Sequence, residues 1–314
     1  MRFSLLALLA VALGSLASCD TYDNDPYRDL IVVEAVMQAL EPVPPVFLST
    51  TIPIDQEFTP QTARRVNDAT VVLQRLDEAG GVLEEVPYEN TAEVGRYDPV
   101  IGVGFPTPRV VPLARYRLLV DVPSFDPVRA ETIVPDTFTT VIPPISPATY
   151  QGEGEQPTVT VTPSAFPGRQ TVYIFSILAV DQEDDPDPTM LTPFARSIYD
   201  NFDEDDEDDR RDFLQESVFG SSPLLNEAGY TVNPDGTRAV PVPWVAFSYY
   251  GFHELSASAV DDALLLFLST QAAQFTPTTL SPGEIPNITT NVQGGLGVFG
   301  SYARSTTTVT ITPD

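Results

Sequence analysis

Short segments rich in β-branched and aromatic residues recur along the first half of the chain, separated by proline, glycine or acidic turn residues. We count about seven such segments before residue 135, and this spacing is typical of an immunoglobulin-like sandwich. The segments are residues 30–36, 46–52, 69–76, 82–88, 96–103, 116–122 and 129–134. We therefore expect residues 30–141 to form an immunoglobulin-like β-sandwich.

A second β-rich region follows residues 142–157, which are rich in proline and glycine and are interpreted as a stiff interdomain linker. Strands are predicted at residues 158–162, 171–180, 242–250 and 305–312. Residues 260–273 fit a helix or a strand, and we favour the helix because two aspartates would occupy its first turn.

An acidic insertion at residues 181–239 is too long for an ordinary hairpin loop. The expected fold class is mainly β, with two β-sandwich-like domains at 30–141 and 158–314. The second domain carries this insertion and one helix.

The N-terminus has the pattern of a targeting segment. Arg2 precedes an apolar stretch at 5–13, and Leu-Ala-Ser at 16–18 comes directly before Cys19. This pattern resembles the bacterial lipobox, so we expect residues 1–18 to be a signal peptide and Cys19 to be lipidated; an ordinary signal peptide is the alternative. Residues 19–29 form an acidic tether, and acidic residues there resemble the surface-export signal of Bacteroidota lipoproteins. The alternatives are a flexible tether without a signal, or retention at the inner membrane, which an aspartate directly after the cysteine favours in enterobacteria. No later stretch approaches the ~18 consecutive apolar residues that a membrane span needs.

The composition excludes several classes of site. All 16 basic residues are arginine, so neither a Schiff-base lysine nor a P-loop lysine is available. A single cysteine excludes an intrachain disulfide and a cysteine-based zinc cluster. The formal charge of −28 argues against nucleic acid as a partner, because phosphate binding needs a basic surface.

Seven consecutive acidic residues at 203–209 are the most conspicuous cluster. Carboxylates on a flexible loop are suitable calcium ligands, although the EF-hand spacing is absent. The candidate calcium ligands are Asp203, Asp205, Asp206, Asp208 and Asp209. The alternative is a solvated, self-repelling loop without a metal, and no other cofactor is expected.

An aromatic run at 244–252 offers candidate ligand-binding residues, namely Trp244, Tyr249 and Tyr250. Aromatic rings stack on sugars or anchor partner proteins, but packing in the core is the alternative. The neighbouring His253 lacks the second histidine of a zincin and a G-x-S-x-G elbow, so we expect a partly buried histidine among aromatic residues.

The segment 295–300 matches G-x-G-x-x-G. A dinucleotide site also needs a helix that opens at the end of the motif, whereas the residues that follow are predicted to form a strand. We expect these glycines to allow a bend or a close approach of two backbones.

Several segments taken together resemble the Bacteroidota lipoproteins of domain-of-unknown-function family 4249. They are 30–35 (LIVVEA), 67–73 (NDATVVL), 95–97 (GRY), 116–120 (YRLLV), 130–135 (AETIVP), 288–292 (ITTNV) and 294–300 (GGLGVFG). The resemblance implies an outer-membrane or surface lipoprotein, often encoded beside a TonB-dependent receptor. It supplies no catalytic residues, and the acidic insertion is longer and more charged than the family leads one to expect.

These observations predict a protein that is not an enzyme. We expect a lipid-anchored outer-membrane lipoprotein, exposed at the cell surface, that acts as an accessory of TonB-dependent nutrient uptake by binding a ligand or capping the transporter. A TonB-dependent receptor is the expected partner. The alternative is a structural or adhesive surface lipoprotein that binds calcium, and an enzyme acting on glycans or peptides ranks third.

Overall fold

The computed structural model describes residues 27–53, 56, 64–102, 106–141, 147–152, 154–203, 206–275 and 288–314. The predicted signal peptide, Cys19 and most of the acidic tether lie outside these residues. So do Asp205 and part of the predicted linker. Within the described part, the chain is mainly β, as the sequence predicts.

Eight strands form the N-terminal sandwich. They are β1 (Ile31–Gln38), β2 (Val46–Thr50), β3 (Arg64–Arg65), β4 (Thr70–Leu76), β5 (Val82–Asn90), β6 (Arg96–Pro99), β7 (Arg115–Asp121) and β8 (Val128–Ile133). Each of the seven predicted segments coincides with one of these strands. Alternate residues of β1, β4, β7 and β8 point into one apolar core, which explains why period-2 patterning predicts this region correctly.

The remaining strands are β9 (Thr140–Val141), β10 (Ala148–Thr149), β11 (Thr158–Val161), β12 (Val172–Ala179), β13 (Phe219–Ser221), β14 (Leu225–Asn226), β15 (Thr231–Val232), β16 (Arg238–Pro241), β17 (Gly251–Val260), β18 (Val292–Gln293) and β19 (Leu296–Thr312). Within the described residues, three α-helices accompany them: α2 (Pro193–Tyr199), α3 (Glu207–Glu216) and α4 (Asp262–Phe275). The predicted helix at 260–273 is therefore confirmed as α4.

The strand predicted at 242–250 is wrong, because the strand lies at β17 instead. Pro241 and Pro243 lack backbone N–H groups, and Pro243 leads into a short 3-10 helix, Trp244–Ala246. Gly251, with a φ of 110°, then redirects the chain into β17.

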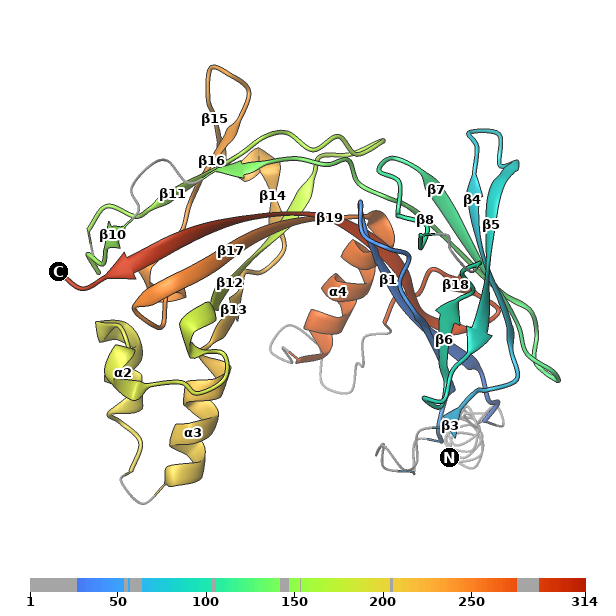
Figure 1. Cartoon of the computed structure of the whole chain (residues 1–314), viewed down its shortest axis with the longest axis horizontal. Coiled ribbons are helices and arrows are strands. Elements are labelled where there is room, and N and C mark those ends of the chain that lie inside the picture. The colour runs from blue at the N-terminus through green and yellow to red at the C-terminus, as the bar shows by residue number, and fades with distance from the viewer. Residues whose placement is uncertain are drawn as a thin grey trace, which may run out of the picture.

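One long sheet connects the two halves of the molecule. Its main strand order is β13-β12-β17-β19-β1-β2-β6-β5-β4-β7-β8-β18, and a second sheet has the order β15-β16-β11-β9. The first part of β19 pairs in parallel with β1, and the later part pairs antiparallel with β17. In Figure 1, α2, α3 and α4 lie on one side of the long strands β12, β17 and β19, while β11 and β16 lie on the other.

Strand β19 also joins two apolar cores. Its residues Phe299 and Ala303 pack in the N-terminal core, whereas Val309 and Ile311 pack in a second core between the two sheets. A third, smaller cluster lies under α2 and α3. Residues 158–314 are thus not a separate packing unit, because the segment from Val292 to Ala303 completes the core of the first sandwich.

Candidate functional site

Strand β1 presents two different faces. Ile31, Val33, Ala35 and Met37 are buried in the N-terminal core. Val32, Glu34 and Val36 point to the opposite face, where they are half-buried or exposed. That second face lies beside α4, which packs mainly against the adjoining strand β19 (Figure 1).

Helix α4 starts at a buried polar cluster. The Asp261 carboxylate accepts a hydrogen bond from the backbone N–H of Leu264, 2.7 Å away, which caps the first turn. The same carboxylate accepts a hydrogen bond from the Thr132 hydroxyl on β8, and the Thr132 hydroxyl lies 2.8 Å from that of Ser301 on β19. One side chain therefore fixes the helix start to two strands.

Burial favours the protonated, neutral form of the Asp261 carboxyl group that caps α4. Asp261 is 1% exposed, and desolvation raises the pKa of its carboxyl from 3.8 to about 6, although the hydrogen bonds from Thr132 and Leu264 act in the opposite direction. A cavity of about 320 Å³ adjoins it, lined by Arg115, Glu131 and Asp262 among others. Of the carboxylates that line it, Asp262 pairs with Arg169 and Glu131 pairs with Arg117.

The G-x-G-x-x-G glycines make the close packing around α4 feasible. A Cβ on Gly295 would lie 2.5 Å from the carbonyl oxygen of Ile31, and one on Gly297 would lie 2.0 Å from that of Val33. Gly297 also has a φ of 103°, which side chains rarely permit. A Cβ on Gly300 would meet the Leu264 side chain at 3.0 Å. The expected close approach is confirmed, and the motif opens a strand rather than a helix.

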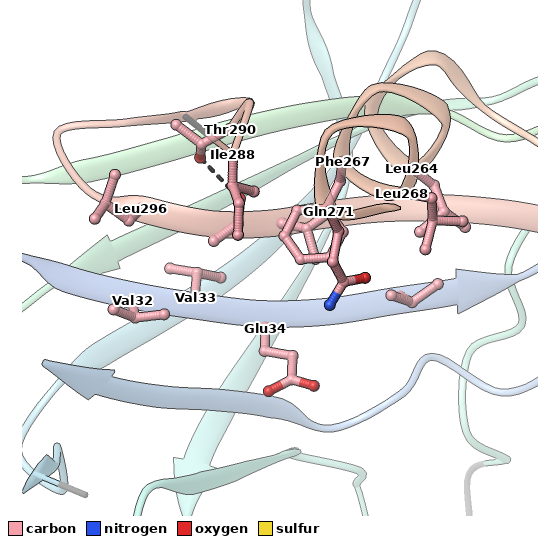
Figure 2. A pocket seen from close by; sticks show the side chains of 13 residues that line it. Val32, Val33, Glu34, Leu264, Phe267, Leu268, Gln271, Ile288, Thr290 and Leu296 are labelled. Atoms are coloured by element: carbon pink, nitrogen blue, oxygen red, sulfur yellow. Dashed lines mark hydrogen bonds between the residues drawn. The ribbon is translucent and has the colours of Figure 1, made fainter. Parts of the chain in front are cut away.

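A pocket of about 940 Å³ lies between α4 and the β1–β19 pair. Figure 2 shows the α4 side chains on one side and those of β1 on the other, with Ile288 and Leu296 at one end. The lining comprises Val32, Val33, Glu34, Val36, Leu264, Phe267, Leu268, Gln271, Ile288, Thr290, Leu296, Gly297 and Val298. Its walls are mainly apolar, and among the lining residues that the structure describes Glu34 alone is charged.

The apolar side chains of α4 are incompletely covered. None of residues 262–271 is fully buried, and Leu266 is 51% exposed on the side away from the pocket lining. An open pocket of this size with apolar walls and a few polar groups has the character of a small-molecule site. The arrangement is suited to holding an apolar ligand body.

The predicted ligand-binding aromatic residues lie away from this pocket; Trp244 and Tyr250 both pack against Tyr150, and Tyr249 lies in a different cluster. Trp244 is buried in the second core, where its indole N–H donates to the Glu155 carbonyl at 3.0 Å. Tyr249 is buried in the third cluster and donates its hydroxyl to the Leu214 carbonyl at 2.8 Å. Tyr250 is half-buried, with its ring 6.0 Å from that of Tyr150. These positions favour the packing alternative, because the side chains of Trp244 and Tyr249 are buried among apolar residues.

The acidic run is not a continuous loop. Asp206 precedes α3, and Asp208 and Asp209 lie in its first turn, where negative charge is favourable near the helix N-terminus. Asp208 pairs with Arg211 at 2.6 Å, and Asp203 is exposed. Over the described ranges, no group of three or more acidic, histidine or cysteine side chains is positioned to share a metal ion.

His253 is buried on β17, as predicted. Its Nδ1 lies 3.0 Å from the Gly251 carbonyl oxygen, and its ring packs edge-on against Phe247. Desolvation lowers the pKa of the imidazole, so the neutral form is favoured in the core.

The pocket residues Glu34, Phe267 and Gln271 were not singled out from the sequence. The available signal was the apolar run at 264–268 near two aspartates and upstream of a glycine motif. What the sequence could not supply was the pairing of β1 with β19, because these strands lie at opposite ends of the chain.

Comparisons with known proteins give one strong match. No curated protein matches the chain. A Salmonella alpha-2-macroglobulin reacted with methylamine is 10% identical over 90% of this chain, with a TM-score of 0.23, and the chain spans 15% of its length. A tetra-tandem repeat of a large adhesion protein is 9% identical over 90% of this chain and 48% of its own, with a TM-score of 0.21. TM-scores this low carry no argument.

Along the described ranges, no helix has the length and apolar character needed to span a bilayer. The family model described as Domain of unknown function (DUF4249) matches residues 19–308, which is nearly all of the chain after the predicted signal peptide. The chain therefore belongs to the DUF4249 family.

Proposed function

We propose that this protein is a lipid-anchored outer-membrane lipoprotein, exposed at the cell surface, that binds an apolar ligand as a non-enzymatic accessory of TonB-dependent nutrient uptake. The apolar pocket between α4 and the β1–β19 pair is the observation that carries the binding role. The lipobox-like sequence before Cys19 supports the anchor, and the resemblance to lipoproteins encoded beside TonB-dependent receptors supports the partner.

The polar groups around the pocket support binding rather than catalysis. Glu34, Gln271 and Thr290 are its polar or charged side chains, and the Thr290 hydroxyl already donates to the Gly297 carbonyl at 2.8 Å. Hydrolytic chemistry needs a nucleophile with an adjacent base, or paired carboxylates, aimed at a common point. The part of the lining that the structure describes offers a single carboxylate, that of Glu34.

Two leucines of α4 provide a matched test of the pocket. Leu268 lines it, whereas Leu266 is outside the lining and half exposed. Leu268→Gln should weaken binding of the neutral fluorescent probe N-phenyl-1-naphthylamine by about tenfold, since an apolar contact worth about 1.5 kcal/mol is lost. Leu266→Gln should leave the affinity unchanged. Equal affinities in all three proteins would exclude this pocket as the binding site.

The partner is tested by a mild-detergent pull-down of the tagged, full-length protein from its native outer membrane, followed by mass spectrometry. A TonB-dependent receptor recovered in stoichiometric amount is the expected result. Cys19→Ala is the control, because it removes the acylated thiol and should shift the protein out of the membrane fraction. Recovery of the wild-type lipoprotein alone would contradict the accessory role.

A further inference from the structure

We infer that the α4 pocket selects amphiphiles in which an apolar chain carries a cationic group, such as a primary alkylammonium ion. This inference rests on the proposed binding function and specifies its ligand class. Three features of the described lining carry it: apolar walls, a carboxylate at the edge that forms no ion pair with a described residue, and the absence of a cation among the described lining residues.

The walls suit an apolar chain. Phe267 and Leu268 from α4 and Val32 from β1 are half-buried around a volume of about 940 Å³, within the usual range for small-molecule sites. Filling this space would remove apolar surface of both partners from water, which is the main source of affinity for such ligands.

The carboxylate lies where the head group of a bound chain would emerge. Glu34 is exposed on β1, between the pocket-lining residues Val32 and Val36, and it lies opposite Phe47 and Val298 on the neighbouring strands. Among the described residues it forms no ion pair. In Figure 2, Gln271 extends from α4 across β1, and the Glu34 carboxylate lies beyond β1, at the edge of the pocket lining away from α4.

The nearby arginine is already engaged. Arg96 lies with its guanidinium 5.9 Å from the ring centre of Phe47. Its Nε donates to Asp98 at 2.8 Å and its terminal nitrogen to Glu93 at 3.1 Å, and these contacts raise the pKa of the guanidinium. Arg96 is therefore committed to two other carboxylates, which leaves Glu34 available to a ligand cation.

The same charges disfavour the opposite ligand class. A fatty-acid carboxylate would lie beside the negative charge of Glu34 at the pocket edge. It would also be repelled by the protein as a whole, whose formal charge is −28. None of the described lining residues is an arginine that could neutralise it. Like charges held at short range raise the free energy of a complex, so an anionic head group is selected against.

The test uses three probes with the same ten-carbon chain: decylammonium, 1-decanol and decanoate. Each displaces N-phenyl-1-naphthylamine from the full-length protein at neutral pH and low salt. Decylammonium should bind at least about fivefold more tightly than 1-decanol, which is the effect of one partly exposed ion pair, and decanoate should bind most weakly. Glu34→Gln should abolish the preference for decylammonium and leave the affinity for 1-decanol unchanged.

The matched control is Glu78→Gln, which removes the same charge from an exposed turn distant in the sequence from the pocket strands. It should retain the preference for decylammonium. Equal affinities for the three probes, or a preference that persists in Glu34→Gln, would overturn the inference while leaving an apolar binding site in place. Binding of none of the probes, nor of N-phenyl-1-naphthylamine itself, would overturn the proposed function as well.

Discussion

Helices α3 and α4 lie on the same side of the long strands but have opposite compositions (Figure 1). Seven of the ten residues of α3 are charged, whereas Asp262 is the only charged residue among the fourteen of α4. The few apolar residues of α3, Phe213 and Leu214, pack against the small cluster around Tyr249. The apolar residues of α4 exceed what the sheet covers and line an open pocket.

The difference shows two uses of the apolar side chains of a helix: they pack in the core, or they line a binding site. In a charged helix such as α3, the few apolar side chains pack in the core and the charged side chains are exposed to water. A half-exposed apolar helix leaves apolar surface in contact with water, which is unfavourable. Exposed apolar surface of this kind marks interaction sites. On this comparison, changes near α4 should affect ligand binding, and changes near α3 should affect stability alone.

The largest effect is expected where β19 passes β1. Gly297→Ala would force a Cβ onto the Val33 carbonyl and a side chain into a positive-φ conformation. The free energy of unfolding should fall by about 3 kcal/mol or more, measured by urea denaturation, together with loss of probe binding. Gly229→Ala is the control, because that site is open and should change stability by less than about 0.5 kcal/mol. A Gly297→Ala protein as stable as wild type would contradict the packing argument.

The second effect concerns the cap of α4. The pKa of Asp261 is higher in the folded state, at about 6, than its ordinary value of 3.8, so the folded protein holds more protons between these values. Stability contributed by this group is therefore full below pH 4 and is lost as the pH rises to about 6 and above. Since one pKa unit corresponds to about 1.36 kcal/mol, the loss amounts to roughly 3 kcal/mol.

Asp261→Asn isolates this contribution, because the other carboxylates and His253 titrate in both proteins. Between pH 7 and about pH 4, the wild type should gain up to about 3 kcal/mol of unfolding free energy relative to the variant. Urea denaturation over a pH series provides the measurement. Parallel pH profiles for the two proteins would show that Asp261 does not titrate as its burial predicts.

A smaller effect is expected on the α3 side. Tyr249→Phe removes the hydroxyl that donates to the Leu214 carbonyl and leaves that acceptor without this donor. The free energy of unfolding should decrease by about 1–2 kcal/mol, while the affinity for N-phenyl-1-naphthylamine stays unchanged. A change in affinity would mean that the α3 and α4 regions are coupled, which would contradict the assignment of stability to α3 and of binding to α4.

The smallest effect is expected at Leu266, which is 51% exposed. Leu266→Gln should alter the unfolding free energy by less than about 0.5 kcal/mol, as is usual at surface positions. Thermal and urea unfolding would both detect a larger loss, and such a loss would indicate that this face of α4 is covered in the folded protein.

The fold was predictable wherever one face of a strand packs and the other meets water. Alternation in β4 and β7 is of this kind, and so is the threonine alternation in the second part of β19. The first part of β19 is buried on both faces from Val298 to Ser301, so its sequence shows no alternation and its start was missed. Pro241 and Pro243 disfavour the strand predicted at 242–250, and the observed strand is β17.

The site was predictable only in its parts. The helix over 260–273, the aspartates at its start and the close approach of the glycines all follow from the sequence. Their convergence depends on β1 pairing with β19, a contact between the two ends of the chain that local pattern does not encode. The aromatic run failed as a guide because aromatic rings serve equally well in cores, where Trp244 and Tyr249 lie.

The central claim is that the space between α4 and the β1–β19 pair receives the ligand. A crystal structure of the protein with 10-bromodecylamine, with the bromine located by anomalous scattering, tests this claim directly. The predicted result is a bromine peak among Val32, Phe267 and Val298, with the amine beside Glu34. A bromine peak against α2 or α3, or no ordered bromine at a saturating concentration, would contradict the account.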